Sequence, residues 1–157
     1  MVSAKNPLGY VATFVYDAAG RRISTVDPLS HRSSTVFDAA GQEIATIDPL
    51  LIRTSFIYDA AGRATAFVNG NGDRSTTVYD AIGQEIQFTD ALGHSTTSIY
   101  DSVGQLVAEI DALGRRLSLA YDAAGRQIAS RNALGLVTTT IYDAADRAVA
   151  RVNPVMQ

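Results

Sequence analysis

Short segments rich in strand-forming residues alternate with turn signals at a fixed interval along this chain. An aromatic residue followed by aspartate recurs every 21 residues, from Tyr16-Asp17 to Tyr142-Asp143, without insertion or deletion. The segments between the turns are about 6 residues long, which is a common strand length. Residues 75–79, with threonine, valine and tyrosine, represent one kind of segment, and residues 42–47 represent the other. An uninterrupted period of this kind indicates a repeat architecture.

Each unit contains two turn signals. In the first turn, Asp17 can accept a hydrogen bond from the backbone two residues on, and Gly20 tolerates a positive φ. The second turn begins at Asp27, where Pro28 presets φ for a type I turn. Helix is the rival interpretation, but turns about 10–11 residues apart leave no room for a typical helix of about 11 residues.

We therefore predict an all-β fold. Seven 21-residue β-hairpin repeats, with about fourteen antiparallel strands, would form a coiled antiparallel β-ribbon, wrapped as a tube or partial shell. The expected boundaries are an N-terminal lead at 1–5, seven repeats at 6–152 and the truncated start of an eighth repeat at 153–157. Contacts should be local, because the chain never returns to an earlier segment.

Strand alternation predicts two rows of side chains on opposite faces. We expect the larger apolar row to be internal, namely Ile23, Ile44, Ile86, Val107, Ile128 and Val149. The row of small residues on the other face comprises Ala45, Ala66, Ala108, Ala129 and Ala150.

The candidate site residues are those of the repeated first turn, and we assign them a structural role. An aromatic side chain would pack against the next hairpin with its hydroxyl bonded across, while aspartate and glycine shape the turn. The set is Tyr16, Asp17, Gly20, Phe37, Asp38, Gly41, Tyr58, Asp59, Gly62, Tyr79, Asp80, Gly83, Tyr100, Asp101, Gly104, Tyr121, Asp122, Gly125, Tyr142 and Asp143. In the seventh unit Asp146 replaces the turn glycine.

Composition narrows the function classes. A hydrophobic content of 46% argues against disorder. A net charge of -3, with Lys5 as the only lysine, is the wrong balance for a nucleic-acid partner. Cysteine is absent, which excludes disulfides and thiolate metal sites. No apolar run reaches the length of about 20 residues that a membrane span needs, and the first residues lack a signal peptide.

The recurring motif Tyr-Asp-Ala-Ala-Gly-Arg, followed by Asp-Pro/Ala-Leu-Gly, resembles the YD repeat of the Rhs (rearrangement hotspot) family. The resemblance covers residues 6–157. That family includes bacterial polymorphic toxins, shell components of insecticidal Tc toxins, wall-associated proteins and teneurins. The resemblance implies a spiralling β-ribbon that builds a hollow shell, often around a toxin domain, in a secreted or cell-surface bacterial protein whose signal lies outside this chain. The family's self-cleavage motif, Asp-Pro-x-Gly, is not matched at Asp27-Pro28 or Asp48-Pro49, so we do not expect autoproteolysis.

We predict no catalytic residues, no cofactor and no metal. Most aspartates recur with the repeat, so the turn role explains them better than a paired-carboxylate mechanism does. His31 and His94 lie three periods apart, whereas a metal site needs three or four ligands at close range. The Ser/Thr-rich segments contain no serine with a base nearby in the sequence.

The sequence thus favours a non-catalytic structural scaffold, a segment of shell or stalk. Its ends, which carry no polar cap, would allow self-association through open strand edges or contact with neighbouring repeats of a longer chain. The alternative is a surface module that binds carbohydrate or a partner protein for adhesion. Glycan and toxin cargo are further possible partners. An enzyme is the third and least favoured reading.

Overall fold

The fold is described from a computed structural model, which describes residues 2–153. This part of the chain contains 15 strands. The bounds are β1 (Val2–Lys5), β2 (Val11–Tyr16), β3 (Arg22–Val26), β4 (Arg32–Phe37), β5 (Glu43–Ile47), β6 (Arg53–Tyr58), β7 (Ala64–Val68), β8 (Arg74–Tyr79), β9 (Glu85–Thr89), β10 (Ser95–Tyr100), β11 (Leu106–Ile110), β12 (Arg116–Tyr121), β13 (Gln127–Arg131), β14 (Val137–Tyr142) and β15 (Ala148–Val152).

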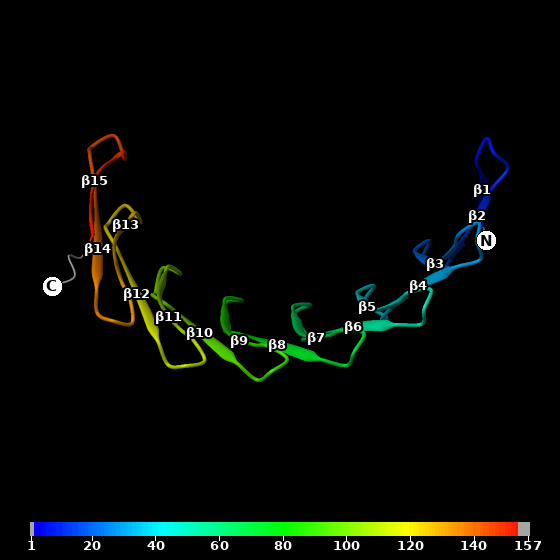
Figure 1. Cartoon of the computed structure of the whole chain (residues 1–157), viewed down its shortest axis with the longest axis horizontal. Helices are drawn as coiled ribbons and strands as arrows, with labels where there is room; N and C mark the ends of the chain where they lie inside the picture. Colours follow the sequence, from blue (N-terminus) through cyan, green and yellow to red (C-terminus); the bar gives the residue numbers. More distant parts are fainter. Residues whose placement is uncertain (1, 154–157) are drawn as a thin grey trace. The chain divides into compact units, whose positions relative to one another are not determined.

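The strands follow one another in sequence order in an open sheet (Figure 1). Every pair of contacting strands given for the described residues is consecutive in the chain and antiparallel. The predicted all-β ribbon of hairpin repeats is therefore confirmed. Strand β1 lies in the segment expected as a lead, where it pairs with β2. Of the expected eighth unit, residues 154–157 lie outside the described residues. Within residues 2–153, no helix has the length and apolar character needed to cross a membrane.

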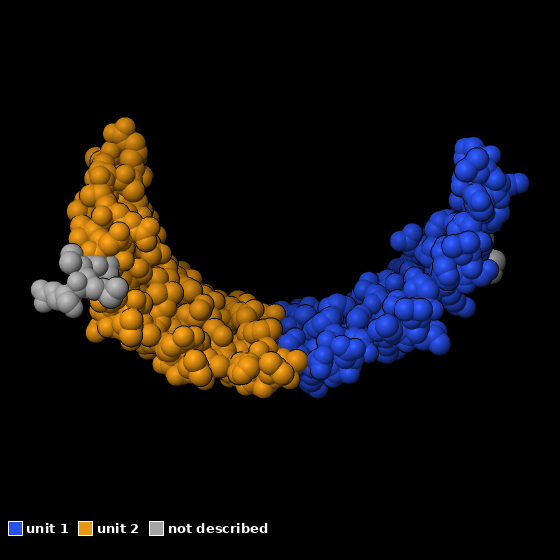
Figure 2. All heavy atoms as spheres, viewed as in Figure 1, with its two compact units in different colours: residues 1–76 blue, residues 77–157 orange. Residues whose placement is uncertain are grey.

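The chain divides into two compact units, shown in different colours in Figure 2. Unit 1 comprises residues 1–76 and includes β1–β7, and unit 2 comprises residues 77–157 and includes β9–β15. The boundary falls within β8. Each unit is described separately below.

Two kinds of hairpin alternate in both units. The hairpins closed by the first turn carry a register shift just before the turn, as between Ile57 and Tyr58. The hairpins closed by the second turn, such as β5–β6, pair without a shift. A shift of this kind is a β-bulge, which inserts one unpaired residue and increases the local twist. In β4–β5, Val36 faces Ala45 and Phe37 faces Glu43, so Ile44 is the extra residue.

Burial reverses the expected roles of the two rows of side chains. The larger apolar row is only half-buried, and its last member, Val149, is 59% exposed. The buried hydrophobic residues of the described chain are instead small, namely Ala45, Ala66 and Ala108. Within residues 2–153 only consecutive strands contact one another, so a large side chain has nothing stacked above it. A methyl group is covered by its cross-strand neighbours, as Ala45 is flanked by Val36 and Ser55.

Candidate functional site: the turn ladder

We use the name turn ladder for the first turns of successive 21-residue repeats. It includes the aromatic residue before each turn and the Arg or Gln after it. In the first rung the amide of Gly20 donates to the carbonyl of Asp17 at 3.1 Å, and the amide of Asp17 donates to the carbonyl of Arg21 at 3.0 Å. Gly20 has φ 78°, so the loop is a type I turn followed by a left-handed residue. Asp17 Oδ1 accepts from the amides of Ala19 and Arg21, both at 2.9 Å.

The second carboxylate oxygen of the turn aspartate binds the arginine that ends the turn. Arg21 Nε lies 2.7 Å from Asp17 Oδ2, and Arg126 Nε lies 2.7 Å from Asp122 Oδ2. The pKa of Asp17 is lowered by the backbone N–H of Arg21 and then by its guanidinium, against partial desolvation. The pKa of Asp122 is lowered first by the guanidinium of Arg126 and then by its backbone N–H. These carboxylates are therefore charged at neutral pH.

Long side chains that follow one first turn reach the first turn of the next repeat. Gln42 Nε2 donates to the carbonyl of Gly62 at 3.3 Å, and Gln84 Nε2 donates to that of Gly104 at 3.2 Å. A Cβ built on Gly62 would lie 3.2 Å from Gln42 Nε2. Glycine at this turn thus provides both the left-handed conformation, with φ 82°, and the space for the side chain from the previous unit.

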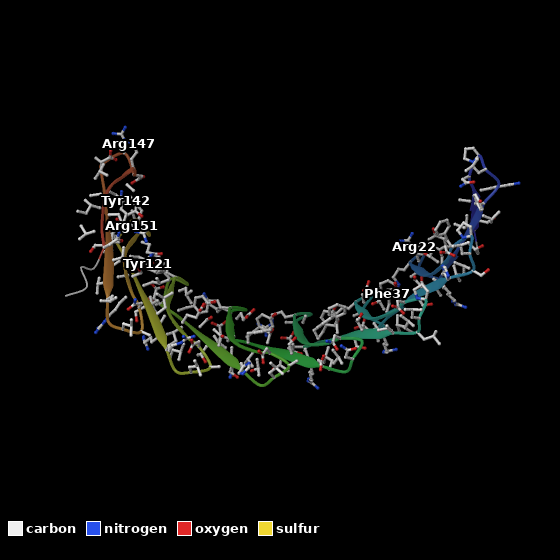
Figure 3. All side chains as sticks on the ribbon, viewed as in Figure 1. Arg22, Phe37, Tyr121, Tyr142, Arg147 and Arg151 are labelled. Atoms are coloured by element: carbon white, nitrogen blue, oxygen red, sulfur yellow. The ribbon has the colours of Figure 1, made fainter. Side chains whose placement is uncertain are left out.

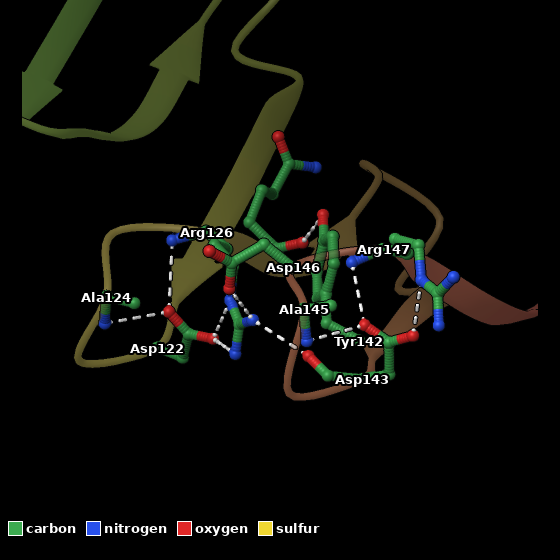
Figure 4. Close-up of polar contacts among 9 residues, drawn as sticks. Asp122, Ala124, Arg126, Tyr142, Asp143, Ala145, Asp146 and Arg147 are labelled. Atoms are coloured by element: carbon green, nitrogen blue, oxygen red, sulfur yellow. Dashed lines mark hydrogen bonds and ion pairs between the residues drawn. The ribbon is translucent and has the colours of Figure 1, made fainter.

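The rung around Arg126 shows the same link with an added charge (Figure 4). Arg126 binds Asp122 of its own turn and also Asp146 of the next turn, 20 residues on. Its guanidinium lies 4.9 Å from the ring centroid of Tyr142. Asp146 is the residue that replaces the turn glycine, and it adopts φ 61°. The replacement of glycine by Asp146 is therefore accompanied by an ion pair between consecutive repeats.

The aromatic residues connect the hairpins through their hydroxyl groups. Each of four tyrosines donates to the backbone carbonyl 15 residues earlier, at 2.9 to 3.0 Å; the pairs are Tyr58 with Glu43, Tyr100 with Glu85, Tyr121 with Leu106 and Tyr142 with Gln127. Phe37 has no hydroxyl, but its ring holds the guanidinium of Arg21 at 4.7 Å from the centroid. Figure 3 shows Phe37 and, in the other unit, Tyr121 and Tyr142.

The second turns repeat the hydrogen-bonding pattern with a different set of side chains. His31 Nδ1 lies 2.9 Å from Asp27 Oδ2, and His94 Nδ1 lies 2.9 Å from Asp90 Oδ2. Each histidine therefore contacts an aspartate of its own turn. Among residues 2–153, no group of three or more His, Cys, Asp or Glu side chains could hold a metal ion.

The chemistry available at the turn ladder is limited. A general acid at neutral pH needs a raised pKa, whereas the shifted aspartates of the described residues all have a lowered pKa. Their oxygens already accept hydrogen bonds within their own turns. The ladder is suited to holding consecutive hairpins in register, and we assign the motif residues that structural role as a proposal.

Two features of the ladder were not identified from the sequence. One is the carbonyl that accepts each tyrosine hydroxyl, since a constant offset of 15 residues becomes meaningful only when the strand register is known. The other is the reach of Gln42 and its equivalents to the next turn. The only signal in the sequence was that this position is Arg or Gln in every repeat.

Comparison with known proteins identifies the repeat. The sequence model of the RHS Repeat family matches residues 1–32, 79–116, 100–135 and 121–155, which together make up more than half of the chain. No curated protein matches the sequence.

Solved structures also resemble this chain. A chain of the TcdB2-TccC3 crystal structure is similar with a TM-score of 0.57 and 15% identity, over 95% of this chain and 11% of that one. A chain of the Photorhabdus luminescens Tc holotoxin pore is similar with a TM-score of 0.44 and 13% identity, over 90% of this chain and 12% of that one. This protein thus spans about a tenth of the solved chains that it matches. The likeness to the TcdB2-TccC3 chain concerns the fold alone.

Proposed function

This chain belongs to the RHS Repeat family, and from that premise we propose that it is a non-catalytic segment of β-ribbon, forming part of a wall or stalk in a secreted or cell-surface bacterial protein. The observation that carries the proposal is the uniformity of the turn ladder. In four repeats the turn aspartate binds the arginine that ends its own turn, and four tyrosines bind the backbone carbonyl 15 residues earlier.

The exposed edges of the sheet support assembly into a larger structure. Every residue of β1 and of β15 is exposed, and each of these strands has a single neighbour in the described sheet. An unpaired strand edge offers a row of backbone donors and acceptors to another strand. We propose that β15 pairs with a second copy of this chain or with neighbouring repeats of a longer chain, so that the ribbon is extended edge to edge.

Light scattering over a range of protein concentrations tests this assembly. The wild-type mass should rise with concentration, whereas Val149→Lys should remain monomeric because a charge on an edge strand opposes pairing. Ile141→Lys is the matched control, since it adds the same charge to an exposed position on β14, which already has neighbours on both sides. A wild-type protein that stays monomeric, or equal effects of the two variants, would contradict edge pairing.

The non-catalytic proposal has its own test. The folded protein should hydrolyse none of a panel of glycans, peptides and esters. Hydrolysis that a single substitution abolishes would overturn the scaffold assignment.

The alternative, a surface that binds a partner, is favoured by one observation. The third residue of most second turns is a leucine that is 73% to 82% exposed, namely Leu8, Leu29, Leu50, Leu92, Leu113 and Leu134. Such a series of exposed apolar tips suits a protein partner better than a sugar. A glycan array without hits on folded protein would remove the carbohydrate version, and both adhesion and toxin cargo remain part of this second proposal.

A further inference from the structure

A hollow in unit 2 differs from the rest of the ribbon in its charge. It has a volume of about 570 Å³, within the range of small-molecule sites, and lies between the second turn of β11–β12 and that of β13–β14. Its lining includes Arg115, Arg116 and Arg131 and contains no carboxylate. Asn132, which also lines it, replaces the acid that opens the second turn in four other units.

Two of these arginines lie on the same face of the sheet. Ser118 on β12 is directly opposite Arg131 on β13, and Arg116 precedes Ser118 by two residues. Side chains two apart on a strand share a face, so Arg116 and Arg131 are diagonal neighbours, with a typical spacing of about 7–8 Å. Like charges at this spacing repel each other, less strongly than directly opposite charges do, and an anion between them would relieve the repulsion.

The structure provides no such carboxylate among the described residues. Arg115 Nε is bound to Asp111 Oδ2 at 2.6 Å, so its charge is compensated. Arg116 Nε donates to the hydroxyl of Ser118 at 3.1 Å, which is a neutral partner. Neither Arg116 nor Arg131 forms an ion pair within residues 2–153. Glu109 and Asp111 line a neighbouring hollow, which shares Arg115 and Arg116 with this one, but neither carboxylate forms an ion pair with Arg116.

The combination is specific to this place in the repeat. The position of Arg131 is apolar or threonine in six other copies, namely Val26, Ile47, Val68, Thr89, Ile110 and Val152, and is basic elsewhere only at Lys5. Arg53 makes the same contact as Arg116, with Nε 3.0 Å from Ser55 Oγ, but the residue opposite Ser55 is Val68. Within residues 2–153, this hollow in unit 2 therefore brings together two guanidinium groups that form no ion pair.

From these observations we infer that Arg116 and Arg131 form a binding site for a tetrahedral oxyanion, the phosphate or sulfate group of a small monoester. Guanidinium groups match the oxygens of such an anion with paired N–H donors. One anion between the two arginines relieves their repulsion. The remaining volume accommodates the organic part of the ester beside Ala133 and Leu134.

Isothermal titration calorimetry at constant ionic strength tests the site, with inorganic phosphate and inorganic sulfate as probes and chloride as the background anion. The wild-type chain should bind at least one of the two oxyanions with one site per chain. Arg131→Val, which places the residue of Val68 and Val152 there, and Arg116→Ala should each weaken binding at least about tenfold. Arg53→Ala is the matched control and should bind like the wild type.

Several results would overturn the inference. They are a lack of binding to both oxyanions at millimolar concentration, an equal loss in Arg53→Ala, or binding unaffected by Arg131→Val. Galactose 6-sulfate and glycerol 3-phosphate, titrated in parallel, then identify the ester, since the one that binds more tightly names the group for which the site is built. Neither assembly nor the lack of catalysis enters these measurements, so the wall proposal stands or falls separately.

Discussion

At Phe37 the turn ladder lacks a hydrogen bond that other repeats form. Four tyrosines donate their hydroxyl to the carbonyl 15 residues earlier. The corresponding carbonyl for position 37 belongs to Arg22, and Figure 3 labels both residues. The ring of Phe37 already contacts Arg21 as that of Tyr142 contacts Arg126, with centroid distances of 4.7 and 4.9 Å. Phe37→Tyr should therefore add the hydroxyl bond without moving the ring.

The magnitude follows from one half-buried hydrogen bond. A typical intramolecular hydrogen bond contributes about 0.5–1.5 kcal/mol net of the water that it replaces. The ring is already ordered, so the new hydroxyl costs little side-chain entropy. For a chain of 157 residues, 1 kcal/mol corresponds to about 2–4 °C in Tm, so Phe37→Tyr should raise Tm by about 1–6 °C.

Thermal and urea unfolding followed by circular dichroism measure this change. Tyr121→Phe is the reverse control and should lower Tm by a similar amount, because it removes the bond to the carbonyl of Leu106. The double variant should return close to the wild type, since the two positions share no partner. An unchanged or lower Tm for Phe37→Tyr, with a clear loss for Tyr121→Phe, would refute the equivalence of the two rungs.

Four further predictions concern burial, backbone strain and pH. Ala108 is 0% exposed, so Ala108→Leu should lower the free energy of unfolding by about 1–3 kcal/mol through overpacking. Ala150 is exposed, so Ala150→Leu should change it by under about 0.5 kcal/mol. Equal effects of the two variants in urea titrations would contradict the burial of Ala108. Leu51 has φ 64°, so Leu51→Gly should raise the free energy of unfolding by up to about 1 kcal/mol. The relief of about 1–2 kcal/mol of left-handed backbone strain exceeds the entropy cost of glycine. Asp146→Gly should stabilise its turn by a smaller increment, because the pair with Arg126 is lost; a lower Tm in both glycine variants would mean that the turns are of another kind. Aspartates such as Asp122 have a lowered pKa in the folded state, so their contribution to stability is present above the unfolded pKa of about 3.9 and is lost as pH falls through the folded pKa. The urea concentration at the unfolding midpoint should therefore decrease when the pH is lowered below about 4, and it should decrease less in Asp122→Asn. A midpoint that does not change with pH would contradict this prediction.

Part of this protein was determined by the sequence alone. The unbroken 21-residue period, the turn aspartates and the turn glycines were sufficient to predict an all-β ribbon of hairpins with sequential contacts. They were sufficient because each turn is a local structure, fixed by residues within five positions of one another, as at Asp17–Arg21.

Only the tertiary structure decided which residues are buried and which side chains meet. One bulge per unit, at residues such as Ile44, breaks the two-residue alternation from which the internal row was predicted. The same register places Tyr121 against the carbonyl of Leu106 and Arg131 beside Arg116. These contacts join neighbouring hairpins, and the register between strands depends on hydrogen bonds across the whole pair rather than on any one turn. The local code therefore fixed the ribbon, and the pairing of its strands created the alanine row, the tyrosine links and the two-arginine hollow.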